Sequence, residues 1–412
     1  MKPPPQPRVA VIGVGTMGSQ VLHQLASRGV PVTGFEQFDI GHGRGAAGGE
    51  TRIFRIAYKE GGGYVPLLRE ARQAWEQLGS QAGTPLLTPC GALTIGSAQD
   101  RDVRTVLGVA HEWGLDVEQL DRRQTEQRFP HHRLFDDDVV LLDREGGLLD
   151  PHRAVVATAQ LAGKAGAAIH TRTTVLDVVE TGTGVAVHYR QGAPSQGLSA
   201  GGDSPHGDAA RSRLQAETDA ADETEDIEVA HFDQVVLCTG PWIGRSVPGL
   251  ADDVEIRRAV LCWFDADDDW APERFPVGIR RSGAENSFSF FPDVGGGVKV
   301  NLHVPKSPVA DPDRLDPVVE GDYTSRVSAA VARCLRGLPE GPTAVRTYMD
   351  GYTADNHGII GRDPQRPSVL VMGGFSGHGF KLAPVFARSA ADLLLTGRTD
   401  TPIDHLSLSR LS

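Results

Sequence analysis

Apolar residues near the start of the chain follow a strand pattern, then a helical pattern, then a strand pattern again. Residues 9–12 are consecutive apolar residues, which is typical of a buried strand. Apolar positions in residues 21–26 recur at helical spacing, and this pattern stops at Gly29. Residues 30–35 then form a second apolar run. The pattern therefore predicts a β–α–β unit.

The next part of the chain alternates between helical and strand patterns of a different kind. Residues 64–78 and 101–115 carry apolar side chains at helical spacing. Residues 84–95 and 139–143 predict short strands. We expect the strands within residues 84–95 to lie at the edge of a sheet. We interpret this block as part of a second domain that is inserted into the first.

From residue 146 onward the pattern predicts a return to the first domain. Asp150 in the N-cap position and Pro151 in the first turn predict the start of a helix. Residues 173–189 predict a hairpin that continues into a further strand. Between the hairpin and that strand, residues 191–228 contain almost no large apolar side chain. We therefore expect a mobile surface insertion, to which we assign no function.

Two later strands end in glycine and lead to different parts of the molecule. The strand predicted at residues 235–238 ends at Gly240, where we expect the chain to cross to the second domain. The glycine loop 373–379 lies between a strand and a helix that runs to residue 395. A helix N-terminus carries a partial positive charge, so Lys381 in the first turn is favourable only opposite an anionic ligand.

Residues 257–342 predict strands of an antiparallel sheet. In the run 298–303, the alternation places Lys299, Asn301 and His303 on one face. Such residues are ordinary on a face that meets water, and they would stand over a bound cofactor if the sheet covers one. The pattern leaves both alternatives open.

Composition narrows the class of protein. The chain has 412 residues, enough for two domains, and 41 basic against 53 acidic residues give a net charge of −12. This excess of negative charge argues against a nucleic-acid partner. The four cysteines show no metal-ligand spacing, so we expect neither a metal site nor a disulfide framework. No apolar run is long enough to span a membrane, and we expect a cytoplasmic protein without a membrane partner.

The glycines of the first β–α–β unit are the strongest chemical signal. Gly13, Gly15 and Gly18 follow the G-x-G-x-x-G spacing between the strand and the helix, and Glu36 ends the second strand. In dinucleotide-binding units the glycines permit a tight turn, close approach of a pyrophosphate and helix packing, while the acid binds ribose hydroxyls. We therefore predict a bound adenine dinucleotide at this helix N-terminus. Chance glycine spacing is the alternative.

A glycine-rich segment, residues 41–50, leads to a pair of arginines. Glycine at this density is typical of a loop that lies against a ligand. Arg52 and Arg55 would share one face of a short helical turn, which predicts an anion site beside the cofactor. A solvated basic helix face is the alternative.

These motifs together resemble those of the monomeric sarcosine oxidase and N-methyltryptophan oxidase family, FAD-dependent amine oxidases of the D-amino-acid oxidase superfamily. The resemblance is most specific in residues 13–18, 51–58 and 374–381. It implies an α/β fold: an FAD-binding Rossmann-like domain of the glutathione-reductase type with an inserted α+β substrate domain on an antiparallel sheet. The FAD-binding domain would comprise residues 1–85, 146–242 and 352–412, and the substrate domain residues 86–145 and 243–351.

The resemblance also implies roles for residues that match the family's motifs. Arg55 and Lys381 match the pair that binds the substrate carboxylate. Lys299 matches the lysine above the flavin that activates oxygen, Arg52 an arginine beside the flavin, and His303 a histidine near the rim of the site. The expected cofactor-binding residues are Gly13, Gly15, Thr16, Met17, Gly18, Glu36, Gly49, Thr51, Arg52, Gly240, Trp242, Gly374, Gly377, His378, Gly379, Phe380 and Lys381.

Two departures from the family pattern concern the flavin link and the size of the substrate. Tyr352 matches the tyrosine of the Cys-x-Tyr-Thr motif only with a small gap. With that gap, Asp350 occupies the position of the flavin-linking cysteine; without it, Tyr348 does. We therefore expect FAD to be held non-covalently. Gly48 stands where the family has a histidine before its Gly-Asp-Thr-Arg run. The smaller residue predicts a wider site and a bulkier substrate than sarcosine.

The resemblance implies oxidation of a secondary amine or N-alkyl amino acid to an imine, with oxygen reduced to hydrogen peroxide. The expected partners are this small molecule and oxygen, and we expect a monomer. Three alternatives remain open: a dehydrogenase with another electron acceptor, a biosynthetic imine- or nitrone-forming oxidase of a natural-product intermediate, and a non-catalytic flavin-binding protein.

Overall fold

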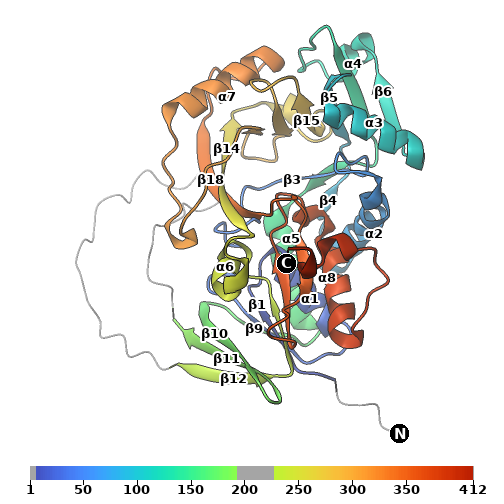
Figure 1. Cartoon of the computed structure of the whole chain (residues 1–412). Helices are drawn as coiled ribbons and strands as arrows, with labels where there is room; N and C mark the ends of the chain where they lie inside the picture. Colours follow the sequence, from blue (N-terminus) through green and yellow to red (C-terminus); the bar gives the residue numbers. More distant parts are fainter. Residues whose placement is uncertain (1–5, 193–226, 412) are drawn as a thin grey trace, which may run out of the picture.

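The computed structural model describes residues 6–192 and 227–411. Nearly all of the predicted insertion therefore lies outside the described residues. The chain forms two layered parts, one built around β1 and the other around β14 (Figure 1). Of the helices in the described part of the chain, none has the length and apolarity needed to cross a membrane.

A largely parallel sheet forms the centre of the lower part in Figure 1. Its central strand is the first apolar run of the sequence, and both faces of that run are buried, as expected where other layers cover a parallel sheet on both sides. β19 alone runs antiparallel to its neighbour. Within the described residues, the order of the six strands is β19 (Ile359–Arg362), β20 (Val369–Gly373), β13 (Gln234–Leu237), β1 (Val9–Ile12), β2 (Val32–Phe35) and β9 (Ala168–His170).

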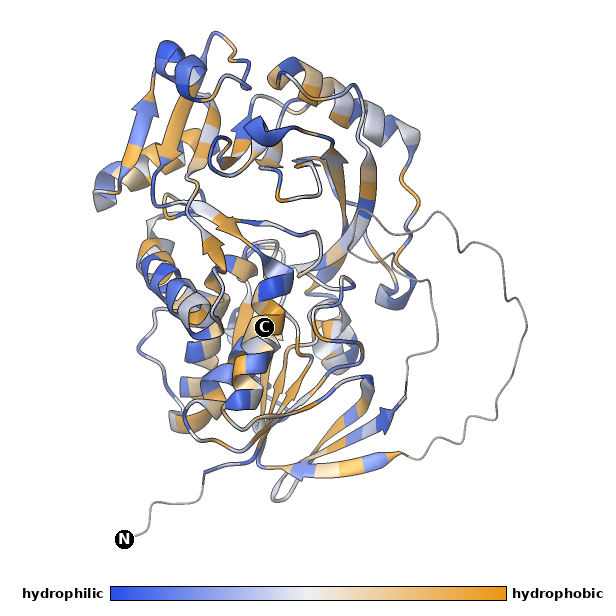
Figure 2. Cartoon of the chain, turned by 180° about the vertical axis from the view of Figure 1, so that it is seen from behind, coloured by the Kyte–Doolittle hydropathy of each residue, from blue (hydrophilic) through white to orange (hydrophobic). Residues whose placement is uncertain are grey.

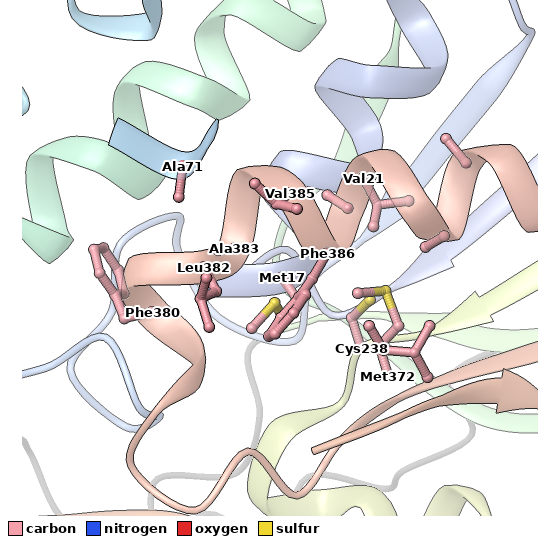
Figure 3. Close-up of a cluster of buried hydrophobic side chains, with 14 of the residues drawn as sticks. Met17, Val21, Ala71, Cys238, Met372, Phe380, Leu382, Ala383, Val385 and Phe386 are labelled. Atoms are coloured by element: carbon pink, nitrogen blue, oxygen red, sulfur yellow. The ribbon is translucent and has the colours of Figure 1, made fainter. Parts of the chain in front are cut away.

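Helices cover one face of this sheet. Asp150 caps the third of them, accepting a hydrogen bond from the Arg153 N–H at 2.9 Å, with Pro151 in the first turn as predicted. Figure 3 shows the contact layer, where Phe386 lies beside Met17 and above Met372. The covering helices are α1 (Thr16–Ala26), α2 (Val65–Ala82), α5 (Pro151–Lys164) and α8 (Gly379–Thr396).

A small antiparallel sheet covers the opposite face. It consists of β10 (Thr173–Thr181), β11 (Gly184–Gln191) and β12 (Glu228–Phe232), which confirms the hairpin and its continuation. Phe35 of the parallel sheet packs edge-on against Phe232 with ring centroids 6.0 Å apart. The helices, the parallel sheet and this small sheet form the layers of the Rossmann-like domain that the sequence resemblance implies.

A mixed sheet forms the upper part of the molecule. All neighbouring strands are antiparallel except the pair β15 and β5. β5 lies inside this sheet, so the expectation of edge strands in residues 84–95 was wrong for it; the flanking turns look alike in either position. In the described chain the eight strands follow the order β18 (Ala344–Tyr352), β14 (Glu255–Phe264), β17 (Val298–Leu302), β16 (Phe288–Phe291), β15 (Val277–Arg281), β5 (Ala92–Ser97), β7 (Asp138–Asp143) and β6 (Val117–Leu120).

Three helices, counted over the described residues, flank this sheet. Val327 and Val331 of one helix pack against the β17 side chains Val298 and Val300, so β17 is buried on its outer face. In Figure 2 the outer helices carry both hydrophobic and hydrophilic colours, which is typical of helices with one buried face. The flanking helices are α3 (Arg101–Trp113), α4 (Arg122–Arg128) and α7 (Gly321–Cys334).

A third small sheet corrects one sequence interpretation. Arg52–Phe54 is a strand, β3, which pairs with β8 (Gly147–Leu149), and β8 also pairs with β4 (Leu87–Thr88). The predicted helical turn at Arg52 is therefore wrong: pairing with β8 extends the backbone, and this partner lies far away in the sequence.

The structure differs from the expected domain division where the chain leaves the FAD-binding domain after residue 242. Residues 243–254 fall in the expected substrate domain, yet Ile243, Val247 and Leu250 pack into the core of the parallel and small antiparallel sheets. The mixed sheet begins at Glu255, the first residue of β14. The rest of the division stays a prediction.

Candidate active site

A cavity of about 1170 Å³ lies between the carboxyl ends of the parallel strands and the inner face of the mixed sheet. Ligands of open α/β sheets bind at that edge of the strands. From below, the cavity is lined by the residues that follow β1, β2, β13 and β20. From above, it is lined by side chains of β14, β17 and β18.

The three motif glycines have distinct surroundings. Gly13 has a φ of +87°, and a Cβ there would stand 2.5 Å from the Cys238 carbonyl oxygen. No atom lies within 4 Å of a Cβ built at Gly15, so its backbone is open toward the cavity. A Cβ at Gly18 would overlap the Gly13 carbonyl, because the helix packs closely on the preceding turn. These are the requirements of a tight turn, an approaching phosphate and close helix packing.

Polar groups around the glycine turn support a ligand at this end of the cavity. The buried hydroxyls of Thr16, Thr51 and Thr239, all of which line the cavity, lack a hydrogen-bond partner among the described residues. Buried polar atoms are normally paired, so these hydroxyls point to a polar ligand. Together with the open backbone at Gly15, they fit the ribityl and pyrophosphate groups of FAD.

Glu36 is buried at the end of β2 and already has partners. Its carboxylate oxygens accept hydrogen bonds from the Val14 N–H at 2.8 Å and the Phe38 N–H at 3.0 Å. His42 lies 3.3 Å away and lines the cavity. A carboxylate has about four acceptor positions, so Glu36 retains capacity for the expected ribose hydroxyls.

The loop before β3 is held by two cations. Arg52 donates to the carbonyl oxygens of Ala46, Gly48 and Thr51, and these hydrogen bonds stabilise the loop that precedes it. Lys299 of β17 donates to the carbonyl oxygens of Gly49 at 2.6 Å and of Thr51 at 2.7 Å. Both cations line the cavity.

Lys299 is desolvated where it stands. Its side chain is buried, and its Nζ lies 3.9 Å from the centroid of the Phe291 ring. Burial first, and then the charge of Arg52, lower its pKa well below the ordinary value. Of its three N–H donors, two serve the loop carbonyls, which leaves one for a ligand.

The sheet face that the sequence left open lines the cavity: Lys299, Asn301 and His303 all do so. His303 Nε2 lies 2.8 Å from the Ser289 hydroxyl, and its Nδ1 lies 3.3 Å from an Arg281 nitrogen. Burial and the charge of Arg281 lower the pKa of His303 to about 3. The imidazole is therefore neutral near pH 7, and it accepts from Arg281 at Nδ1 and donates to Ser289 from Nε2.

Arg55 and Lys381 approach the same aromatic ring. The Arg55 guanidinium carbon lies 5.4 Å from the centroid of the Tyr58 ring, and Lys381 Nζ lies 4.8 Å from it. Arg55 is 7% exposed, and its Nε and Nη1 have no hydrogen-bond partner in the described residues. Burial lowers the pKa of Lys381 to about 7, and nearby Arg55 acts in the same direction. Two buried cations with unused donors form an anion site.

A buried carboxylate that the sequence interpretation missed stands beside this pair. Glu60 Oε1 lies 2.6 Å from Lys59 Nζ and 3.3 Å from His378 Nδ1, and that nitrogen is 2.9 Å from the Tyr58 hydroxyl. Burial alone would raise the pKa of Glu60, but the charges of His378, Arg55 and Lys59 outweigh it and hold the pKa at about 2. Its only sequence signal is its position directly after the 51–58 motif.

The space at Gly48 is filled, contrary to the expectation of a wider site. A Cβ at Gly48 would overlap the ring of Tyr348, and a Cβ at Gly49 would come within 3.4 Å of the same ring. Tyr348 thus occupies the room that the small residue leaves. Tyr352, four residues further along β18, accepts a hydrogen bond from Lys306.

The loop before α8 brings the last predicted residues to the cavity. Gly374 and Gly377 have φ values of +62° and +80°, which favour glycine. Phe380 faces the helices, where it stacks on Trp75 with ring centroids 5.5 Å apart. Trp242, beyond β13, donates from its indole N–H to Asp313 at 2.7 Å.

The structure brings most of the predicted site residues to one cavity. Gly18, Gly48 and Gly49 lie behind its lining, where they permit close packing. The predicted residues that line it are Gly13, Gly15, Thr16, Met17, Glu36, Thr51, Arg52, Arg55, Gly240, Trp242, Lys299, His303, Tyr352, Gly374, Gly377, His378, Gly379, Phe380 and Lys381.

The known proteins that this chain is similar to are oxidoreductases, among them several oxidases. The model of the FAD dependent oxidoreductase family matches residues 8–393. The chain is 31% identical to the monomeric sarcosine oxidase of Streptomyces avermitilis over 98% of this chain and 97% of the relative. It is 26% identical to the N-methyl-L-tryptophan oxidase of Salmonella dublin, over 98% of both chains. Its fold is similar to that of NikD, an amino acid oxidase essential for nikkomycin biosynthesis, with a TM-score of 0.79, 20% identity and 98% coverage of each chain.

Proposed function

This chain belongs to the FAD-dependent oxidoreductase family and is an amine or amino-acid oxidase, and on that premise we propose that its substrate is a secondary amine that carries a carboxylate. The proposal extends to an imine as the product and to oxygen as the electron acceptor, which is reduced to hydrogen peroxide. We also propose that the enzyme acts as a monomer.

The observation that carries this proposal is the Arg55 guanidinium beside Lys381, whose Nε and Nη1 have no hydrogen-bond partner among the described residues. A planar guanidinium with two free donor nitrogens suits the two oxygens of a carboxylate, and a lysine adds a point charge. An amine without a carboxylate would leave the Nε and Nη1 donors of buried Arg55 without a hydrogen-bond partner among the described residues, which costs free energy. The site therefore favours amino acids over simple amines.

The residues of the chain orient the substrate and keep its charges apart. Arg55 and Lys381 would hold the carboxylate, which fixes where the nitrogen and the adjacent carbon lie. Bound FAD supplies the acceptor for the hydride that leaves that carbon. The neutral His303 would lie at the cavity wall without adding a positive charge beside the substrate nitrogen.

We propose that FAD is held without a covalent bond. Tyr348 and Asp350 occupy the candidate positions of the flavin-linking cysteine. Cys238 does line the cavity, but it lies at the end of β13 beside Gly13, and burial raises its thiol pKa. Acid precipitation should therefore leave the yellow colour in the supernatant, and colour in the pellet would contradict this.

The substrate class is tested with matched pairs of amines. Each N-alkyl amino acid is compared with the same amine without the carboxylate, and peroxide formation is followed. We expect turnover of the amino acids and little or none of the amines. Equal turnover would contradict the carboxylate site, and activity with a dye acceptor but not with oxygen would identify a dehydrogenase.

Replacing Glu36 by alanine should weaken retention of FAD. The change removes a carboxylate that would bind the ribose hydroxyls, and it leaves the Val14 and Phe38 N–H groups without their acceptor, at a cost of about 1.5–3 kcal/mol for hydrogen bonds to a charged group. Gel filtration at low protein concentration should show flavin separating from the variant. The control is Glu126→Ala on exposed α4, and equal flavin retention in both variants would contradict the role of Glu36.

A further inference from the structure

A row of side chains on the inner face of the mixed sheet has no part in the proposed carboxylate site. Asn301 of β17 lies directly opposite Ser289 of β16, and Ser289 lies opposite Ile279 of β15. All three line the cavity. Opposite side chains of an antiparallel pair have Cβ atoms about 4.5–5.5 Å apart, so the three form one continuous patch of the cavity wall, which we call the Asn301 row.

The side-chain amide of Asn301 is directed into the cavity. Its strand neighbours Val300 and Leu302 are buried on the outer face of the sheet, among side chains of α7. Successive side chains of a strand point to opposite faces, so Asn301 faces the cavity, and it is partly exposed there. The amide forms no hydrogen bond to another described residue. Its two N–H donors and its oxygen are therefore all available to a ligand.

Ser289 contributes a further donor to this patch. Its hydroxyl oxygen accepts a hydrogen bond from His303 Nε2 at 2.8 Å, while His303 Nδ1 accepts from Arg281. The hydroxyl hydrogen of Ser289 is not used in this chain of hydrogen bonds. A ligand that carries an acceptor atom could therefore bind to Ser289 and Asn301 together.

The Asn301 row lies close to the segment that bears Arg55. Lys299, two residues before Asn301 on the same face, donates to the Thr51 carbonyl at 2.7 Å, and Arg55 follows Thr51 by four residues. Two residues along a strand span about 6–7 Å. On the other side of the row, burial lowers the pKa of His303, and the charge of Arg55 is among the further causes. Contacts on both sides of the row thus place it within reach of a substrate held by Arg55.

The charged side chains near the far end of the cavity are already paired. Arg281 lies 3.1 Å from the Asp102 carboxylate, and Lys59 Nζ lies 2.6 Å from that of Glu60. All four residues line the cavity. A second charged group on the substrate would have to break one of these ion pairs or remain unpaired, and either costs free energy. The surroundings of the Asn301 row therefore favour a neutral group.

We infer that Asn301, together with Ser289, determines specificity by binding a neutral hydrogen-bonding group, such as an amide, carbonyl or hydroxyl, on the substituent that the substrate carries beyond N-methylglycine. An apolar substituent would displace water from the Asn301 amide and the Ser289 hydroxyl without replacing its hydrogen bonds. A site that is built to form hydrogen bonds rejects such an analogue. This inference rests on the proposed function, which places the substrate carboxylate on Arg55 and Lys381.

Three substituents of nearly equal size test the inference: carbamoylmethyl, isobutyl and carboxymethyl. Each is attached either to the α-carbon of N-methylglycine or to the nitrogen of glycine. Anaerobic reduction of the flavin is followed by absorbance at several substrate concentrations, so the result does not depend on the electron acceptor. In at least one of the two positions, we expect the ratio of reduction rate to dissociation constant to favour carbamoylmethyl over both others by roughly tenfold or more.

Asn301→Leu is the matched variant, because leucine has nearly the shape of asparagine and no hydrogen-bonding group. We expect it to lose the preference for carbamoylmethyl over isobutyl and to reduce its flavin with the isobutyl substrate at least as well as the unaltered enzyme. That second result also shows that the variant is folded. Asn286→Leu is the control: Asn286 accepts from Arg333 at 2.7 Å and does not line the cavity, so its preference should be unchanged.

The outcomes separate this inference from the function on which it rests. If substrates are oxidised without a preference in either position, or if Asn301→Leu keeps the preference, the inference is wrong while the carboxylate site stands. A preference for carboxymethyl, or equal slowing of every substrate by Asn301→Leu, also overturns it. If none of the substrates reduces the flavin, the proposed function fails and the inference fails with it.

Discussion

Replacing Arg55 by alanine is expected to raise the KM for carboxylate substrates by roughly a hundredfold or more. The guanidinium is buried, and its free nitrogens have no other partner in the described chain. Losing one partner of a buried charge pair costs about 2–5 kcal/mol. Because the lost contact is made in the ground state as well as in the transition state, kcat should change much less than KM. Steady-state kinetics with one N-alkyl amino acid measures both.

Arg55→Lys is the matched variant, since it keeps the charge and loses the two-pronged geometry. We expect its KM to lie between those of the enzyme and Arg55→Ala. The slow turnover of an amine without a carboxylate should be the same in all three proteins. An unchanged KM in Arg55→Ala would remove this residue from substrate binding.

Lys381, which would bind the substrate carboxylate together with Arg55, makes this binding sensitive to pH. The pKa of Lys381, about 7, is lowered by burial, so its charge is present below that pH and is lost as the pH rises through it. Affinity for a carboxylate should therefore fall above about pH 7. Lys381→Met should bind the carboxylate more weakly at low pH and lack this dependence. The KM measured from pH 6 to 9 decides between the two profiles.

Replacing Lys299 by methionine should slow the reaction of the reduced enzyme with oxygen by roughly a hundredfold or more. Negative charge develops on oxygen when it accepts the first electron, and this charge favours the protonated form of buried Lys299. A cation at about 4 Å stabilises such a charge by up to about 4 kcal/mol. Anaerobic reduction by the substrate should change little, because Arg55 and Lys381 would bind the substrate carboxylate. Stopped-flow measurements of the two half-reactions separate these effects.

Lys299→Arg keeps a charge at this position and should retain part of the oxygen reactivity. Lys299 also donates to the Gly49 and Thr51 carbonyls, so a displaced loop is a competing explanation. A displaced loop would slow both half-reactions. Equal slowing of reduction and reoxidation in Lys299→Met would therefore remove this lysine from oxygen chemistry.

The sequence by itself determined the local elements and their chemistry. The β–α–β unit with Gly13, Gly15 and Gly18 depends on contacts between residues close in the chain, so its spacing suffices. The period-two alternation of β17 likewise placed Lys299 and His303 on one face. What lay beyond that face could not be decided locally, because the cavity belongs to another part of the chain.

Only the tertiary structure decided how distant segments meet. Arg52 lies in a strand rather than a helical turn because its partner β8 is almost a hundred residues away. The glycine at position 48 does not widen the site because Tyr348, three hundred residues later, fills the space. Asp350 was notable in the sequence only as a position without cysteine. Its surroundings become visible when β18 meets the loop before α8, since burial and charge depend on neighbours in space rather than in sequence.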